Sequence, residues 1–247
     1  MAFFITFFMP NQYFQFKQFM IFQDKCAMKV CTDSCLFGAW VAEKIKNNTI
    51  LPNTVLDIGA GTGLLSLMLA QETNAIIDAV EIDELSFLQA TSNFSSSPWS
   101  NNLKVYLDDI NNFSSTSLYD VIISNPPFFE NNLKSKIAEK NIALHSELLT
   151  IEQLFTIAKK TLKTEGHFFT LLPYSRREKC LSIANKYEFH LIEEMMVQQT
   201  ETHEPFRSMF IFSRIKSDTL SSRMIIKEKG NYSISFTQLL QPYYLNL

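Results

Sequence analysis

The chain has no excess of positive charge and no apolar stretch long enough to cross a lipid bilayer. Its 247 residues include 22 Lys and Arg against 25 Asp and Glu, a net charge of −3. Proteins that hold nucleic acid through their overall field are usually basic, so any such ligand would need a local basic patch. The apolar run at residues 2–9 is far shorter than a span of roughly 18 residues and lacks the basic start of a signal peptide. We therefore expect a cytoplasmic protein with no membrane partner.

Cysteine and histidine are too few and too scattered to indicate a metal site. Cys26, Cys31 and Cys35 follow a C-x4-C-x3-C spacing, and Cys180 stands alone. This spacing matches neither the C-x2-C zinc pattern nor a small disulfide framework. We expect free thiols and no bound metal.

From about residue 54 the chain alternates short apolar runs with helical segments. This order is typical of an α/β fold with a mostly parallel sheet and helices on both faces. No helix is expected between the last two strands, which should therefore pair antiparallel. A helix before Gly166 should end at that glycine. The predicted strands are 55–57, 76–81, 103–107, 119–124, 167–172, 189–198 and 207–214, and the predicted helices are 34–46, 64–71, 84–94, 151–162 and 175–187.

Three of the six glycines lie in one turn, at Gly59, Gly61 and Gly63, directly after the first of these strands. Glycine allows a tight turn and the close approach of a ligand, and the first such turn of an α/β sheet is where nucleotide-like ligands bind. The spacing is G-x-G-x-G rather than the G-x-G-x-x-G of dinucleotide sites. Asp57 before the turn would repel a pyrophosphate but can bind the ammonium group of a methionyl moiety. Both features favour S-adenosylmethionine over NAD.

Acidic residues follow the next two strands. Glu81 ends its strand and can accept hydrogen bonds from both ribose hydroxyls. Asp83 is also a candidate for this site, although its position is more typical of a helix N-cap. Asp109, next to Ile110, is placed to bind the adenine amino group, and its neighbour Asp108 stays open as an alternative.

The tetrapeptide Asn125-Pro126-Pro127-Phe128 follows the fourth strand, where two prolines make a stiff turn. An adenine N6 or an amide nitrogen is a poor nucleophile because its lone pair is delocalised. The Asn125 Oδ1 and the Pro126 carbonyl can each accept one N–H of that group, and Phe128 can stack on a planar substrate. The tetrapeptide thus predicts methyl transfer to a planar nitrogen and leaves adenine and amide equally possible.

The chain resembles the bacterial tRNA1(Val) adenine-37 N6-methyltransferases along almost its whole length. The resemblance rests on residues 16–33, which include F-K-Q-F and Q-D-K-C-A-M-K-V, on the L-F-G-A-W that begins at Leu36, and on the closing Y-Y-L at residues 243–245. It implies a seven-stranded, Rossmann-like methyltransferase sheet, S-adenosylmethionine as cofactor and a tRNA substrate. It also implies that Lys29, Thr32 and Asp33 lie at the methionine end of the cofactor. Cys31 and Ser34 stand where the family usually has glycine, and Phe128 where it often has tyrosine.

We expect one domain over residues 1–247, with residues 1–50 folded over the cofactor edge of a core at 51–247, and a monomer. Protein glutamine methyltransferases share the chemistry but carry a larger helical domain before the glycine turn, and DNA adenine methyltransferases normally add a target-recognition domain. A ribosomal RNA adenine stays open, and a non-catalytic RNA-binding module is disfavoured by the complete tetrapeptide. The candidate RNA contacts are Lys17, Lys25, Lys29, Lys134, Lys136, Lys140, Arg176 and Arg177.

Overall fold

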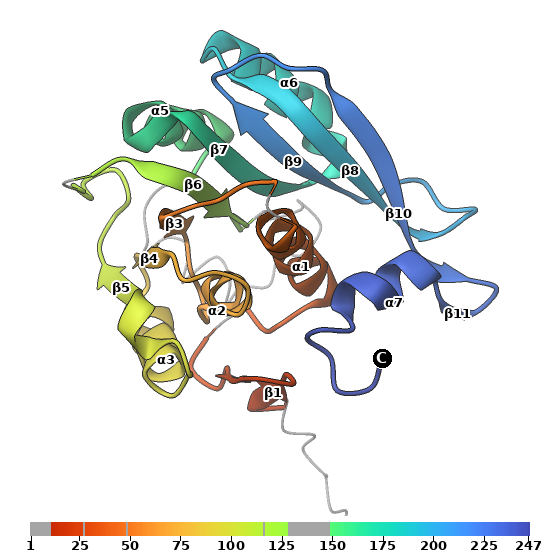
Figure 1. Cartoon of the computed structure of the whole chain (residues 1–247), viewed down its shortest axis with the longest axis horizontal. Helices are drawn as coiled ribbons and strands as arrows, with labels where there is room; N and C mark the ends of the chain where they lie inside the picture. The colour runs from red at the N-terminus through yellow and green to blue at the C-terminus, as the bar shows by residue number, and fades with distance from the viewer. Residues whose placement is uncertain (1–10, 27, 48, 116, 128–148) are drawn as a thin grey trace, which may run out of the picture.

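A nine-stranded sheet with helices on both faces organises the structure (Figure 1). The computed structural model describes residues 11–127 and 149–247, apart from positions 27, 48 and 116. The strand order is β11-β10-β8-β9-β7-β6-β3-β4-β5, and a separate hairpin is formed by β1 and β2. The strands are β1 (Tyr13–Gln15), β2 (Met20–Phe22), β3 (Thr54–Ile58), β4 (Ile76–Glu81), β5 (Leu103–Leu107), β6 (Tyr119–Ser124), β7 (Leu162–Pro173), β8 (His190–Thr200), β9 (Arg207–Ser213), β10 (Leu220–Glu228) and β11 (Asn231–Tyr232).

Three of the described helices, α3, α5 and α7, begin at a residue whose side chain caps the helix. Asp83 caps α3 by accepting a hydrogen bond from the Ser86 N–H, and Thr150 and Gln153 form a capping box at the start of α5. The helices are α1 (Thr32–Lys46), α2 (Leu64–Ala70), α3 (Glu84–Ser95), α5 (Ile151–Thr161), α6 (Arg177–Lys186) and α7 (Ile234–Leu240), with 3₁₀ turns η1 (Ser100–Asn102) and η2 (Tyr174–Arg176). None of these helices is long and apolar enough to cross a membrane, within the residues that the structure describes.

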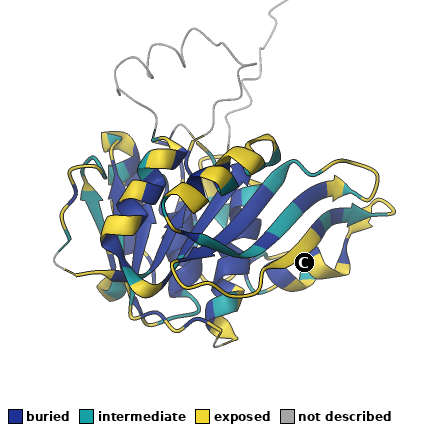
Figure 2. Ribbon diagram, turned by 90° about the horizontal axis from the view of Figure 1, so that it is seen from above, coloured by how far each residue is buried: buried dark blue, intermediate teal, exposed yellow. Residues whose placement is uncertain are grey.

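Two apolar cores lie on opposite faces of the sheet. One joins the sheet to α1, α2 and α7 and is built around Trp40 and Phe169. The other joins it to α5 and α6 and is built around Phe155 and Phe168. Figure 2 shows the buried strands between helices whose outer turns are exposed. The predicted α/β class, with helices on both faces, is confirmed.

The direction of the strands agrees with the expectation from the sequence. β3, β4, β5, β6 and β7 pair in parallel, and β9 lies antiparallel between β7 and β8. The predicted antiparallel pairing of the last two strands is therefore confirmed. All seven predicted strands are present, and β10 and β11 extend the sheet beyond them. β10 pairs in parallel with β8 and its first residues are exposed, so it lacks the continuous apolar run that identifies a buried strand.

The prediction that Gly166 ends a helix was wrong. The helix α5 ends at Thr161, and Gly166 lies inside β7. The register between β6 and β7 shifts beside it, between Tyr119 and Val121. A Cβ at this position would come within 2.7 Å of the Leu162 side chain and 3.0 Å of the Asp120 carbonyl oxygen. Gly166 is thus required by close packing at an irregularity of the strand.

The N-terminal segment contacts both the C-terminal residues and helix α3. Phe16 bridges to Tyr244, and its ring packs on Phe19 at 4.5 Å. The Asn93 side chain, on α3, hydrogen-bonds the N–H and the carbonyl of Phe22 and the carbonyl of Thr62. Because Thr62 belongs to the glycine turn, Asn93 connects the N-terminal hairpin to that turn.

Candidate active site

The glycine turn and the tetrapeptide at residues 125–128 follow directly paired residues of neighbouring strands. Ile58 at the end of β3 pairs with Ser124 at the end of β6, and the Ser124 hydroxyl donates to the Ile58 carbonyl over 2.9 Å. Gly59 and Asn125 therefore leave the sheet side by side, because parallel strands lie about 4.8 Å apart. The carboxyl ends of parallel strands are where α/β sheets bind ligands.

The three glycines of the turn do two different things. All three have positive φ, at 75° for Gly59, 56° for Gly61 and 81° for Gly63. A Cβ on Gly59 or Gly61 would meet nothing within 4 Å, so these positions face open space. A Cβ on Gly63 would overlap the ring of Phe94 on α3. Gly59 and Gly61 leave room for a ligand, whereas Gly63 allows the turn to pack against α3.

Glu81 is bound to the glycine turn. Its Oε2 accepts a hydrogen bond from the Gly61 N–H at 2.7 Å, and its Oε1 accepts one from the Asp83 N–H at 2.9 Å. Burial raises the pKa of this carboxyl group, although the Asp83 and Gly61 N–H groups counteract the effect. Each oxygen keeps a further lone pair for a ribose hydroxyl. Asp83, which caps α3, lies next in the chain and has a structural role of its own.

Asp57 lies beneath the turn and is fully buried. Its Oδ2 accepts a hydrogen bond from the Ser66 hydroxyl at 2.7 Å, and its Oδ1 has no hydrogen-bond partner among the described residues. Burial raises the pKa of this group to about 6, while the hydrogen bonds from Ser66 lower it. An unsatisfied buried carboxylate oxygen is costly unless a cation or donor binds it.

The Asn125 side chain is oriented by Ser34. Its Nδ2 donates a hydrogen bond of 2.8 Å to the Ser34 hydroxyl, in the first turn of α1. This bond fixes the orientation of the amide group, whose Oδ1 can then accept a hydrogen bond from a substrate. Pro126 is buried and Pro127 exposed. Phe128 lies outside the described residues, as do Lys134, Lys136 and Lys140.

The residues expected at the methionine end lie near the start of α1. Thr32 is the first residue of the helix. The Asp33 Oδ2 accepts a hydrogen bond from the Arg207 Nε at 2.9 Å and forms an ion pair with it. The Lys29 ammonium donates to the Gln23 carbonyl, which holds it against the hairpin. A cofactor contact of these three residues stays a prediction.

Asp109 forms the turn after β5. Its Oδ1 accepts hydrogen bonds from the N–H and the side-chain amide of Asn111, both at 2.9 Å. Ile110 is half-buried against the second core. The neighbouring Asp108 donates its N–H to the Glu81 carbonyl, which brings this turn to the end of β4. The turn thus lies beside Glu81, as a contact with the adenine end of a nucleoside requires.

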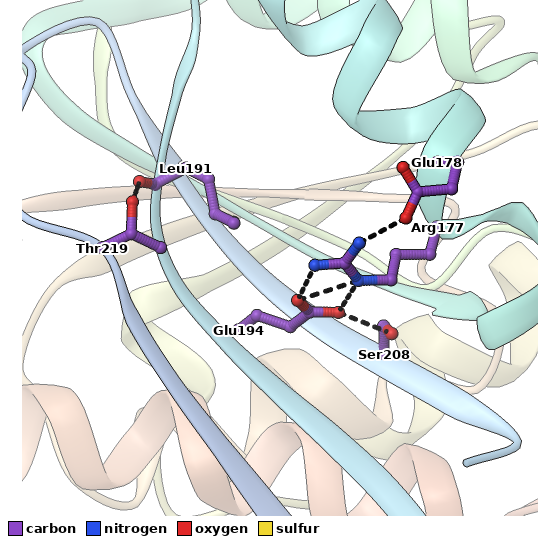
Figure 3. A network of polar contacts seen from close by, with 6 residues as sticks. All are labelled: Arg177, Glu178, Leu191, Glu194, Ser208 and Thr219. Atoms are coloured by element: carbon purple, nitrogen blue, oxygen red, sulfur yellow. Dashed lines mark hydrogen bonds and ion pairs between the residues drawn. The ribbon is translucent and has the colours of Figure 1, made fainter. Parts of the chain in front are cut away.

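Of the predicted RNA contacts, Arg177 has a different partner. Figure 3 shows its guanidinium against the buried carboxylate of Glu194 on β8, with N···O distances between 2.8 and 3.1 Å. The Ser208 hydroxyl donates to the same carboxylate at 2.9 Å, and Glu178 binds the outer side of Arg177. The hydrogen bonds that the guanidinium donates to Glu194 raise the pKa of Arg177 above its usual range. The guanidinium is thus paired within the fold, and a contact of Arg177 with RNA stays a prediction.

The other basic candidates for RNA contacts differ in their exposure and in their hydrogen bonds within the protein. The Lys17 ammonium donates to the Gln241 carbonyl at 2.5 Å, near the C-terminus. Lys25 and Arg176 are exposed, and the Lys25 N–H donates to the Gln89 side chain. Their contact with RNA stays a prediction.

Two residues at this edge of the sheet, Ser34 and Arg207, are not predicted as site residues from the sequence. Ser34 orients Asn125 from 91 positions away, and Arg207 pairs with Asp33 from 174 positions away. Ser34 was noted only as a departure from a family pattern, and Arg207 only as the start of a strand. No group of three or more His, Cys, Asp or Glu among the described residues is placed to hold a metal ion.

These features define a methyltransferase. Residues 38–187 match the family model of the methyltransferase small domain. A predicted O-methyltransferase from Agrobacterium tumefaciens has the same fold, with a TM-score of 0.65, 14% identity, and coverage of 87% of this chain and 100% of that one.

Two curated relatives define the family. The tRNA1(Val) (adenine(37)-N6)-methyltransferase of Phocaeicola vulgatus is 39% identical over 97% of this chain and 100% of its own length. The enzyme of the same name from Flavobacterium psychrophilum is 40% identical over 95% of this chain and all of its own. The chain belongs to the family of tRNA1(Val) (adenine(37)-N6)-methyltransferases. The resemblance inferred from its sequence is confirmed.

The cofactor of this class is S-adenosylmethionine, and the site fits it. Gly59 and Gly61 leave open space above the turn, as the close approach of a nucleoside requires. The unpartnered Oδ1 of Asp57 lies beneath the turn and suits a positively charged amino group, directly or through a water molecule. Glu81 suits the ribose. The preference for this cofactor over NAD is confirmed.

Proposed function

We propose that this protein transfers a methyl group from S-adenosylmethionine to N6 of adenine 37 in tRNA1(Val). The family relationship supports the substrate. The observation that carries the chemistry is the Asn125 amide, whose nitrogen is bound to Ser34 and whose oxygen is left for a substrate N–H.

The residues of the tetrapeptide hold the target nitrogen. We infer that the Asn125 Oδ1 and the Pro126 carbonyl each accept one N–H of the adenine amino group. This arrangement directs the nitrogen lone pair toward the methyl group and stabilises the positive charge that develops on nitrogen. When bound, S-adenosylmethionine supplies an electrophilic methyl group on a sulfonium. No strong general base is needed, because the amino group becomes acidic once it is methylated.

The adenine has to leave its stack to reach Asn125. Stacking on Phe128 would compensate part of this cost. Because the chain carries a net charge of −3, the RNA must be held by a local group of cations, and we propose Lys17, Lys25 and Arg176 as members. We further propose that residues 1–247 act as one methyltransferase domain, with residues 1–50 over the cofactor edge, as a cytoplasmic monomer.

Methyl transfer from labelled S-adenosylmethionine tests the substrate. The transcripts are unmodified tRNA1(Val) and the same transcript with guanine at position 37, with ribosomal RNA and release-factor protein as alternative substrates. We expect label only in the transcript with adenine 37. Label in the guanine-37 transcript would assign another position, and label only in ribosomal RNA or in the protein would replace the proposed substrate.

Replacing Asn125 tests the mechanism. We expect Asn125→Ala to lower kcat by roughly 10²- to 10³-fold, as the loss of one positioned hydrogen-bonding group does in other active sites. The Kd of S-adenosylmethionine, measured by titration calorimetry, should stay nearly unchanged. Asn185→Ala, at an exposed position of α6, is the matched control. Loss of cofactor binding in Asn125→Ala would mean that its assigned role is wrong.

A further inference from the structure

A cleft of about 330 Å³ opens between the start of α1 and the ends of β8, β10 and β11. It is lined by Thr32 and Asp33 of α1, which are also expected at the methionine end of the cofactor, and by Phe206, Lys227 and Tyr232. The volume lies within the range of small-ligand pockets. The cleft is therefore large enough for one planar group of a ligand.

The cleft lies on the opposite side of Asn125 from the cofactor loop. In the sheet order, the glycine turn and Glu81 belong to β3 and β4, whereas the cleft belongs to β8 and β10. Asn125 follows β6 between these two halves, and Ser34, which binds it, is the neighbour of Asp33. The side of Asn125 that faces away from the glycine turn is therefore the side on which the cleft opens.

Two aromatic rings that line the cleft, those of Phe206 and Tyr232, each lie close to a cation. The Arg207 guanidinium lies 5.5 Å from the centre of the Phe206 ring and pairs with Asp33. The Lys227 ammonium lies 5.7 Å from the centre of the Tyr232 ring and forms no ion pair with a carboxylate of the described residues. The Tyr232 ring also stacks on the Phe236 ring, with the ring centres 4.7 Å apart.

Flat rings and an unpaired ammonium group are the chemistry that binds single-stranded nucleic acid. Bases stack on aromatic side chains, and a lysine binds the phosphate that links them. A purely apolar ligand would leave Lys227 desolvated without a partner, at a considerable cost. The lining therefore favours a nucleotide over an apolar ligand.

We propose that this cleft binds a nucleotide adjacent to the target adenine, with its base against Phe206 and its phosphate on Lys227. The inference rests on the proposed function, since it takes the substrate to be an anticodon loop. The cleft would then hold the nucleotide at position 36 or 38 while the adenine lies at Asn125. It would serve to position the loop and to hold it open.

Two variants test the cleft, with the intact protein and an unmodified anticodon stem-loop. Phe206→Leu keeps apolar bulk but removes the flat ring, and Lys227→Ala removes the cation. We expect each to raise the KM for the RNA by roughly tenfold or more, as the loss of a stacked base or a phosphate contact does. Lys227→Ala should also lower the salt dependence of RNA binding by about one phosphate contact, and Lys227→Arg should restore it.

The control is Lys216→Ala, an exposed lysine between β9 and β10 at the opposite edge of the sheet. Its KM for RNA should equal that of the wild type. The Kd of S-adenosylmethionine should be unchanged in all variants. Weaker cofactor binding in Phe206→Leu or Lys227→Ala would assign the cleft to the cofactor and overturn the proposal.

An abasic nucleotide at position 36 or 38 gives an independent test. If the base stacks on Phe206, one of these RNAs should raise the KM of the wild type, and Phe206→Leu should add little to that increase. Additive effects would overturn the proposal. Wild-type protein that methylates no RNA would instead refute the proposed function, whereas methylation with unchanged KM in both cleft variants would refute the cleft alone.

Discussion

The glycine turn allows a sharp test, because Gly61 and Gly63 share a left-handed backbone but have different surroundings. At Gly61 a Cβ would enter open space, and at Gly63 it would overlap the Phe94 ring and come within 3.1 Å of a second ring carbon. Gly61→Ala should therefore obstruct the cofactor and destabilise the fold less than Gly63→Ala does. Gly63→Ala should destabilise the fold.

The size of the two effects follows from these contacts. A left-handed conformation costs an alanine about 1–2 kcal/mol, and both variants share this term. Overpacking against Phe94 adds roughly 1–3 kcal/mol at Gly63 alone. Gly63→Ala should thus lose about 2–5 kcal/mol of unfolding free energy, and Gly61→Ala about 1–2. For a chain of this length the additional loss at Gly63 corresponds to a Tm lower by roughly 2–12 °C.

Thermal denaturation and titration calorimetry with S-adenosylmethionine measure the two quantities separately. We expect Gly61→Ala to weaken cofactor binding more than Gly63→Ala, and Gly63→Ala to lower the Tm more. In the double variant Gly63→Ala/Phe94→Leu, the smaller side chain should recover part of the stability, with a coupling of about 0.5–3 kcal/mol. If Gly63→Ala kept its Tm and lost the cofactor, the packing role assigned to Gly63 would be refuted.

Three further changes test the surrounding contacts. Ser34→Ala removes the hydrogen bond that orients the catalytic amide, so kcat should fall roughly tenfold with the cofactor Kd unchanged; an unchanged kcat in single-turnover assays would exclude this role. Burial raises the pKa of Asp57 from 3.8 to about 6, so its protonated form favours folding. The unfolding free energy of the cofactor-free protein should therefore fall by up to roughly 3 kcal/mol as the pH rises from about 4 to 6. In urea denaturation, Asp57→Asn should not show this fall in unfolding free energy with pH. The same pH dependence in Asp57→Asn and the wild type would contradict the assignment of the fall to Asp57. Arg177→Ala leaves the buried Glu194 carboxylate without its cation and should cost roughly 3 kcal/mol or more, whereas Lys179→Ala on the same helix should change the urea midpoint little; equal effects would refute the structural role of Arg177.

The cofactor half of the site is the part that could be predicted best from the sequence. The order of strand, glycine turn and acidic strand end is local in sequence, and parallel strands bring their carboxyl ends to one edge. Gly59, Gly61 and Glu81 could therefore be placed together before the fold was known. Asn125 could be placed beside them for the same reason, since β6 pairs with β3.

Other features depend on contacts that the sequence does not indicate. The different role of Gly63 arises from Phe94, which belongs to another helix, and Gly166 is fixed by packing at an irregularity between β6 and β7. Arg177 was predicted to contact RNA from its charge alone. Only the fold shows that Glu194 neutralises it, because the carboxylate lies on a strand that follows the helix.

The sequence by itself determined the fold class, the cofactor turn and the nitrogen chemistry of the tetrapeptide, because each depends on local order and on residue type. The tertiary structure alone decided how Asn125 is oriented and what lies across from the cofactor. Ser34 and Arg207 reach this edge from helix α1 and strand β9, which meet only when the sheet is assembled. The sequence determines the charge and shape of each side chain, but tertiary packing determines which partners neutralise or orient that side chain.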